Sequence, residues 1–232
     1  EASEIVILDD NFKSIGKAIL YGRTIYNNIR KFLIFQLTIN VGAVLISFVC
    51  PLLGMENPLT IIQILWLNII MDTGAALALG GEPALDRYMD EAPKKRDEKI
   101  ISPYMISAIG IGAAWSFVMG LVFLMSDFSH SHFRDNSALL TSYFTWFVFL
   151  SLANSLNART DRVNVFEHIG ENSGFISVIG VAVVVQVIMT EFGNVIMRCF
   201  GLTASEWIFV IAMAFTIIPV DIVRKLVVGS NK

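Results

Sequence analysis

Apolar residues in this chain gather in long runs, and short clusters of charged residues separate the runs. A helix needs about 20 residues to cross the hydrocarbon core of a bilayer, which is about 30 Å thick. Runs of roughly this length predict an all-α fold, a polytopic membrane bundle of six transmembrane helices. The expected spans are Phe32–Leu53, Ile61–Leu79, Tyr104–Met125, Leu139–Leu156, Phe175–Met189 and Trp207–Val223.

A further helical pattern precedes the first span. Apolar residues that include Ile19 and Tyr26 recur at helical spacing, and most of the nearby lysines and arginines fall outside this stripe. Either Asp10 or Asn11 can cap the start of such a helix. The pattern therefore predicts an amphipathic stalk over residues 11–31 that continues without a break into the first span.

The division into domains follows from these elements. Residues 1–10 contain the β-like run "EIVIL", which is too short to form a sheet alone. We expect residues 1–10 to end a preceding soluble domain and residues 32–232 to form the membrane domain. The longest polar loop, residues 80–102, has mixed charges, glycines and prolines. We expect it to be a solvated connector, and the alternative is a contact surface for soluble domains.

Composition and charge support a membrane protein. Hydrophobic residues make up 55% of the chain and charged residues only 16%, whereas soluble domains typically have roughly 45–50% apolar and about 25% charged residues. Of the 17 lysines and arginines, all except Arg134 and Arg198 fall on the same side of the predicted spans. Because cytoplasmic loops carry this excess, both termini are predicted to be cytoplasmic. The net charge of −3 gives no indication of a nucleic-acid partner, and membrane lipid is the expected surrounding.

The candidate chemistry lies in the second span, "QILWLNIIMDTGAALALGG". Asn68 and Asp72 are four residues apart and share one face of a helix near mid-bilayer. A central Asp costs about 2.5–3.5 kcal/mol to insert, so it needs a partner inside the bundle. Carboxylate and amide oxygens suit a hard cation, and Gly74 would help the helix to loosen. Ion coordination is one interpretation, and a protonated Asp bonded to a neighbouring helix is the other.

Other polar residues of the spans have more ordinary explanations. Asn40 lies at a similar depth to Asn68 and suits either an inter-helix hydrogen bond or an ion ligand. Ser151 is expected to bond to its own helix, and the alternative is that it lines a cavity. In the last span Pro219 is expected to kink the helix, and Asp221 is expected to form a local pair with Arg224.

Several segments resemble a known family. The stretches "EASEIVILDDNFKSI", "GRTIYNNIRKFLIFQLTINV", "LWLNIIMDTGAALALGGEP" and "NSLNARTDRVNVFEHI" resemble, in order, segments of P-type cation ATPases. They are most similar to the plasma-membrane-type calcium pumps, including bacterial relatives. The resemblance is strongest in the first 85 residues. It implies that the six spans are pump helices five to ten, and that residues 1–10 end the phosphorylation domain.

The resemblance also implies an activity for the intact protein. Such pumps bind ATP and magnesium in cytoplasmic domains and phosphorylate an aspartate in a "DKTG" motif. Neither "DKTG" nor "GDGxNDxP" occurs in this chain. ATP and magnesium would therefore belong to the N-terminal portion of the same pump, which would be the partner of this chain in the cell membrane. The intact protein would be a calcium-transporting ATPase, and this chain would not hydrolyse ATP alone.

The resemblance assigns ion ligands residue by residue. Asn68 and Asp72 match calcium ligands of helix six, and Asn40 matches a polar position of helix five that helps to bind ion in two-site pumps. At three further positions the two-site pumps have glutamate, threonine and glutamate, and this chain has Ala43, Met71 and Ser151.

These departures imply a single site, with one calcium per cycle and protons as the counter-ion. Manganese is an alternative cargo because it accepts the same oxygen ligands. A non-enzymatic membrane subunit is the alternative from another class of protein.

Overall fold

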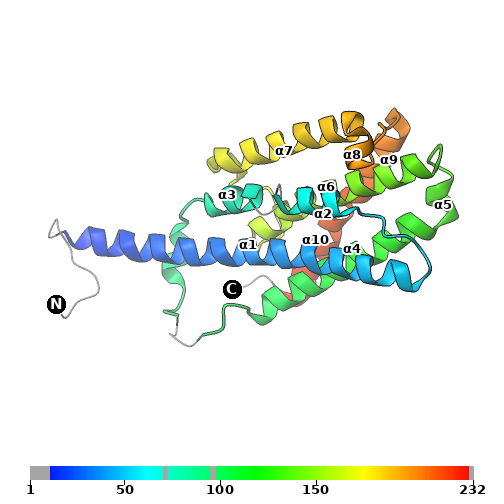
Figure 1. Cartoon of the computed structure of the whole chain (residues 1–232). Helices are drawn as coiled ribbons and strands as arrows, with labels where there is room; N and C mark the ends of the chain where they lie inside the picture. Colours follow the sequence, from blue (N-terminus) through cyan, green and yellow to red (C-terminus); the bar gives the residue numbers. More distant parts are fainter. Residues whose placement is uncertain (1–10, 70–72, 95–97, 230–232) are drawn as a thin grey trace.

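The longest element of the computed structural model, which describes residues 11–69, 73–94 and 98–229, is the helix α1 (Phe12–Leu52). Its first turn is capped by Asn11, whose side-chain oxygen accepts from the Lys13 backbone N–H at 3.0 Å. The helix runs unbroken through the predicted stalk and the first span, and its N-terminal part projects beyond the other helices in Figure 1. The predicted continuity is therefore confirmed, whereas the cytoplasmic location of the stalk and the assignment of residues 1–10 lie outside what the structure describes.

The rest of the described chain is helical too, and the all-α fold class is confirmed for these residues. Two short 3-10 turns, Asp86–Asp90 and Ile169–Glu171, lie in the loops. The α-helices after α1 are α2 (Ile61–Asn68), α3 (Gly74–Gly80), α4 (Pro103–Met125), α5 (Asp127–His130), α6 (Asn136–Arg159), α7 (Ser173–Phe192), α8 (Asn194–Met197), α9 (Ala204–Phe215) and α10 (Ile217–Val228).

Five helical stretches among the described residues are long and apolar enough to cross a membrane. The predicted second span, Ile61–Leu79, is not one of them. The described residues of this span include the helices α2 and α3, and residues 70–72 between the two helices lie outside the described residues. The last stretch, Ala204–Val228, is interrupted at Thr216 between α9 and α10. Pro219, at which a kink is predicted, lacks the N–H that would bond to the carbonyl of Phe215, and this explains the interruption.

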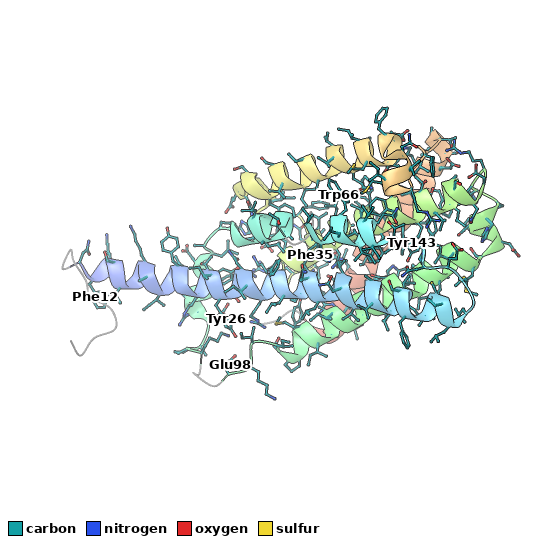
Figure 2. All side chains as sticks on the ribbon, viewed as in Figure 1. Phe12, Tyr26, Phe35, Trp66, Glu98 and Tyr143 are labelled. Carbon is teal, nitrogen blue, oxygen red and sulfur yellow. The ribbon has the colours of Figure 1, made fainter. Side chains whose placement is uncertain are left out.

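Helix α6 is the centre of the bundle. It packs against α1, α4, α7, α9 and α10, and nearly all of its residues are buried, with Trp146 and Phe147 at 0% exposure. Phe35 of α1 and Tyr143 of α6 both lie inside the bundle in Figure 2. Ser151 donates from Oγ to the carbonyl of Phe147 at 2.8 Å, as predicted. Its hydroxyl is therefore satisfied within its own helix.

Helices α1 and α4 approach each other closely at glycines. A Cβ built on Gly112 of α4 would lie 2.7 Å from Cγ2 of Thr38 on α1. Thr38 is buried, and its Oγ1 donates to the carbonyl of Ile34 at 2.7 Å, which fixes its rotamer. Small residues permit this kind of close contact between helices in membranes.

The variant Gly112→Ala is therefore expected to lower the free energy of unfolding by about 1–3 kcal/mol, because the added methyl forces α1 and α4 apart. Thermal unfolding of the purified protein in detergent would measure the change. Gly110→Ala is the matched control, since a Cβ at Gly110 meets no atom within 4 Å. Equal unfolding temperatures for the two variants would contradict the close packing at Gly112.

Candidate ion-binding segment

The three predicted ion ligands lie on α1 and at the junction between α2 and α3. Asn68 is the last residue of α2 and is exposed. Asn40 on α1 is half-buried and forms no side-chain hydrogen bond with another residue that the structure describes. Asp72 lies outside the described residues. The structure therefore leaves the predicted pairing of Asn68 and Asp72 untested.

The backbone around the predicted ligands departs from regular α-helix. Helix α2 ends at Asn68 and α3 begins at Gly74. Ile69 and Thr73, the described residues that flank positions 70–72, have the wider geometry of a π-helix. Single π-helical turns inside α-helices are often found at functional sites. The π-helical geometry at Ile69 and Thr73 therefore occurs in the stretch that contains the predicted ion ligands Asn68 and Asp72.

The start of α2 is held by a capping box. Thr60 Oγ1 accepts from the backbone N–H of Gln63 at 3.2 Å, and Gln63 Oε1 accepts from the backbone N–H of Thr60 at 2.9 Å. The same buried Gln63 side chain donates from Nε2 to the carbonyl of Met197 at 2.7 Å. This bond fixes α2 to the segment that follows α7.

The end of α3 is held by two asparagines from other helices. Asn28 of α1 donates from Nδ2 to the carbonyls of Gly80 and Glu82, both at 3.2 Å. Asn172, the residue that caps α7, donates from Nδ2 to the carbonyl of Ala78 at 3.0 Å. The candidate segment therefore lies between two helix ends that are each anchored to distant parts of the chain.

A buried carboxylate that the sequence analysis missed lies directly after α3. Glu82 accepts from Arg159 Nε at 3.0 Å, from Lys31 Nζ at 3.1 Å and from Asn172 Nδ2 at 2.8 Å. Arg159 also donates to the carbonyl of Glu167 and lies over the ring of Phe175. The carboxylate joins α1, α6 and α7 at one point. The sequence did contain a signal for this residue, namely a carboxylate that lies between a glycine pair and a proline directly after an apolar run.

The expectation of a solvated connector for residues 80–102 is wrong for its first part. Besides Glu82, Tyr88 is buried, and Arg23 of α1 donates to the carbonyls of Tyr88 and Met89 at 2.6 and 2.8 Å. Burial alone would lower the pKa of Arg87, but the Asp161 carboxylate 3.1 Å away raises it above the ordinary value. Arg23 thus fixes the connector to the stalk, and the Arg87–Asp161 pair fixes it to the segment that follows α6.

The last helix is held by a second charged cluster. Arg224 Nε lies 2.6 Å from Asp221 Oδ1, as predicted, and Lys225 Nζ lies 2.8 Å from Asp221 Oδ2. Arg224 also donates to the Tyr104 hydroxyl at 3.1 Å, and Lys225 donates to the carbonyl of Asn157 at 3.0 Å. The cluster fastens α10 to α4 and α6, and both cations share the single Asp221 carboxylate.

A polar cavity of about 920 Å³ lies between the stalk, the connector, α4, α6 and α10. Asn154 and Asn157 line it, and within the described part of the chain Asn154 Nδ2 and Asn157 Oδ1 have no hydrogen-bond partner. Lysines, arginines, aspartates and glutamates all contribute to the lining. Because both signs of charge are present, the cavity suits water rather than an ion of one charge. Among the described residues, His, Cys, Asp and Glu form no cluster of three that could hold a metal.

Comparisons with known proteins point to one family. The family described as "Cation transporting ATPase, C-terminus" matches residues 56–227. The chain is 37% identical to "Calcium-transporting ATPase 10, plasma membrane-type" of Arabidopsis thaliana, over 98% of this chain and 22% of that protein. It is 38% identical to "Plasma membrane calcium-transporting ATPase 4" of Bos taurus, over 89% of this chain and 18% of that protein. The chain thus spans about a fifth of the length of these relatives.

Proposed function

The chain belongs to the cation-transporting ATPases, and we propose that it is the C-terminal membrane part of an ATP-driven pump that exports calcium across the plasma membrane. The supporting observation is that the similarity to plasma-membrane-type calcium-transporting ATPases runs along nearly the whole chain. It includes the segment of Asn68 and Asp72, where helix α2 ends and α3 begins.

The pump would have six helices in this part of the membrane. Five are the long apolar stretches, and α2 with α3 would form the sixth as an interrupted helix. Interrupted helices place free backbone groups and side chains around transported ions in many transporters. The N-terminal part of α1, residues 12–31, would be the cytoplasmic stalk, and both termini would be cytoplasmic.

Asn68, Asp72 and Asn40 would bind the transported calcium. Asp72 would supply the negative charge, and the two asparagines would supply neutral oxygen ligands of the kind that calcium accepts. Ser151 carries no charge where the two-site pumps have a glutamate, so a second divalent ion there would lack a carboxylate to balance it. One calcium per cycle, with protons returning in the opposite direction, is the stoichiometry that we propose.

Energy would come from domains in the N-terminal portion of the pump. They would bind ATP and magnesium and would transfer a phosphate to an aspartate there. The resulting tilt of the stalk would move α1 against α2 and α3 and would open the site around Asp72 to the outside. The residues of this chain would bind, release and exclude the ion, and none of them would contact ATP.

The test is ATP-driven uptake into inside-out membrane vesicles that contain the full-length protein. We expect calcium to accumulate only with ATP, and calcium to promote phosphorylation of the protein. Phosphorylation that responds to manganese and not to calcium would contradict calcium as the cargo. A full-length protein without any metal-dependent phosphorylation would favour a non-enzymatic membrane subunit instead.

A further inference from the structure

Glu82 joins three helices through two different oxygens. Oε1 accepts from Arg159 Nε of α6 and from Asn172 Nδ2, the cap of α7. Oε2 accepts from Lys31 Nζ of α1. One oxygen is therefore bound to the core of the bundle, and the other is bound to the stalk helix.

These charges are withdrawn from solvent. The side chain of Arg159 is 1% exposed, that of Glu82 is 5% exposed and that of Lys31 is 12% exposed. In such surroundings an ion pair is screened far less than on an exposed surface. Among the ion pairs between residues that the structure describes, the Lys31–Glu82 pair is the one that α1 contributes. It is thus the charged link between the stalk and the end of α3.

The link lies close to the candidate ion-binding segment. Glu82 follows the end of α3 at Gly80 by two residues, and α3 begins at Gly74, directly after the segment. Asn28 lies almost one helical turn before Lys31 on α1 and holds the carbonyls of Gly80 and Glu82. A movement of α1 relative to α6 must therefore either pull the end of α3 or break the bonds that Lys31 and Asn28 make to it.

We propose that Lys31, Glu82 and Arg159 form a coupling triad, in which Lys31 is the positioning residue that transmits movement of the stalk to α3 and so to the ion-binding segment. The proposal rests on the proposed function, since it assigns the mechanical connection within that pump. Arg159 binds Glu82 to the core of the bundle, and Lys31 binds the same carboxylate to the stalk. Lys31 contacts no transported ion in this proposal.

The charge balance of the triad identifies the variant that separates coupling from folding. The three side chains carry a net charge of +1, so removing the Lys31 charge leaves a neutral Glu82–Arg159 pair. Methionine keeps the long apolar stem of lysine and donates no hydrogen bond. Lys31→Met therefore removes the charged link to α1, leaves the hydrogen bonds from Asn28 in place and leaves the buried pair intact.

The experiment measures calcium transported per ATP hydrolysed by the full-length protein in sealed vesicles. For Lys31→Met we expect the ratio to fall several-fold, while calcium-dependent phosphorylation keeps its wild-type calcium requirement. Lys31→Arg retains a charged donor and is expected to restore most of the ratio. Lys17→Met is the matched control, because Lys17 is an exposed lysine of the same helix and its variant is expected to match wild type.

Two results would overturn the coupling triad. One is a wild-type ratio in Lys31→Met. The other is an equal loss of transport and of ATP hydrolysis, which is the result of a merely structural role. If the wild-type protein itself transports no calcium, the proposed function fails, and the triad proposal falls with it. If the wild type transports calcium and Lys31→Met couples normally, only the triad proposal fails.

Discussion

Replacing Glu82 with glutamine is expected to lower the free energy of unfolding by about 3–5 kcal/mol, which is the usual cost of removing one partner of a buried ion pair. The variant keeps the volume and one carbonyl oxygen of the side chain. It leaves Arg159, which is 1% exposed, and Lys31 facing a neutral group. The buried Arg159 and the partly buried Lys31 would then lie together without a carboxylate, and this arrangement is costly in a medium of low polarity.

Thermal unfolding of the purified protein in detergent, followed by circular dichroism, would measure this loss. Glu56→Gln is the matched control, because Glu56 is exposed and its variant is expected to change stability by less than about 0.5 kcal/mol. The double variant Glu82→Gln with Arg159→Met is expected to recover much of the loss, since it removes the stranded charge as well. A single variant as stable as Glu56→Gln would show that Glu82 does not neutralise Arg159.

The sequence predicts the helices well because their causes are local. The run of apolar residues that follows the stalk produces a helix that continues through both, and Asn11 caps it as one of the two residues expected. Pro219 interrupts the last span for a reason that is visible in the residue itself. Ser151 bonds to the carbonyl four residues before it, which is again a local preference.

The contacts of Glu82 escape prediction because they are not local. Its charged partners are 51 and 77 residues away in the chain, and Asn172 is 90 residues away. A loop with mixed charges, two glycines and two prolines has the composition of a solvated connector. Only the folded bundle brings Lys31 and Arg159 to the same carboxylate. Tertiary packing therefore decides the burial of this residue.

The predicted second span, Ile61–Leu79, stays a prediction, because residues 70–72 lie outside the described residues. An apolar run of this length predicts one helix by composition alone, and composition contains no information on the geometry at Ile69 and Thr73. The polar residues within the run were the sequence signal that this stretch differs from an ordinary apolar span. The ion ligands themselves stay a prediction, since Asp72 lies outside the described residues and calcium binding has to be measured.

The substitution Asp72→Asn in the full-length protein is expected to reduce ATP-driven calcium uptake at least about a hundred-fold. Asparagine keeps the size and one oxygen of aspartate but removes the negative charge. An uncompensated divalent ion in a membrane interior is strongly disfavoured, and the cost of a central charge on insertion scales, about 2.5–3.5 kcal/mol, corresponds to roughly a hundred-fold in affinity. Initial rates of calcium uptake into inside-out vesicles, measured over a range of calcium concentrations, would show the loss.

The matched control for this experiment is Asp86→Asn, because Asp86 is an exposed aspartate of the connector and its variant is expected to transport normally. Asn68→Ala should have a smaller effect than Asp72→Asn, since it removes a neutral oxygen ligand and leaves the charge of Asp72 in place. Asp72→Asn should insert into the membrane at least as well as wild type, because the amide is less costly there than the carboxylate. Loss of transport with normal membrane insertion would therefore reflect the missing charge, and wild-type uptake by Asp72→Asn would exclude Asp72 as the essential calcium ligand.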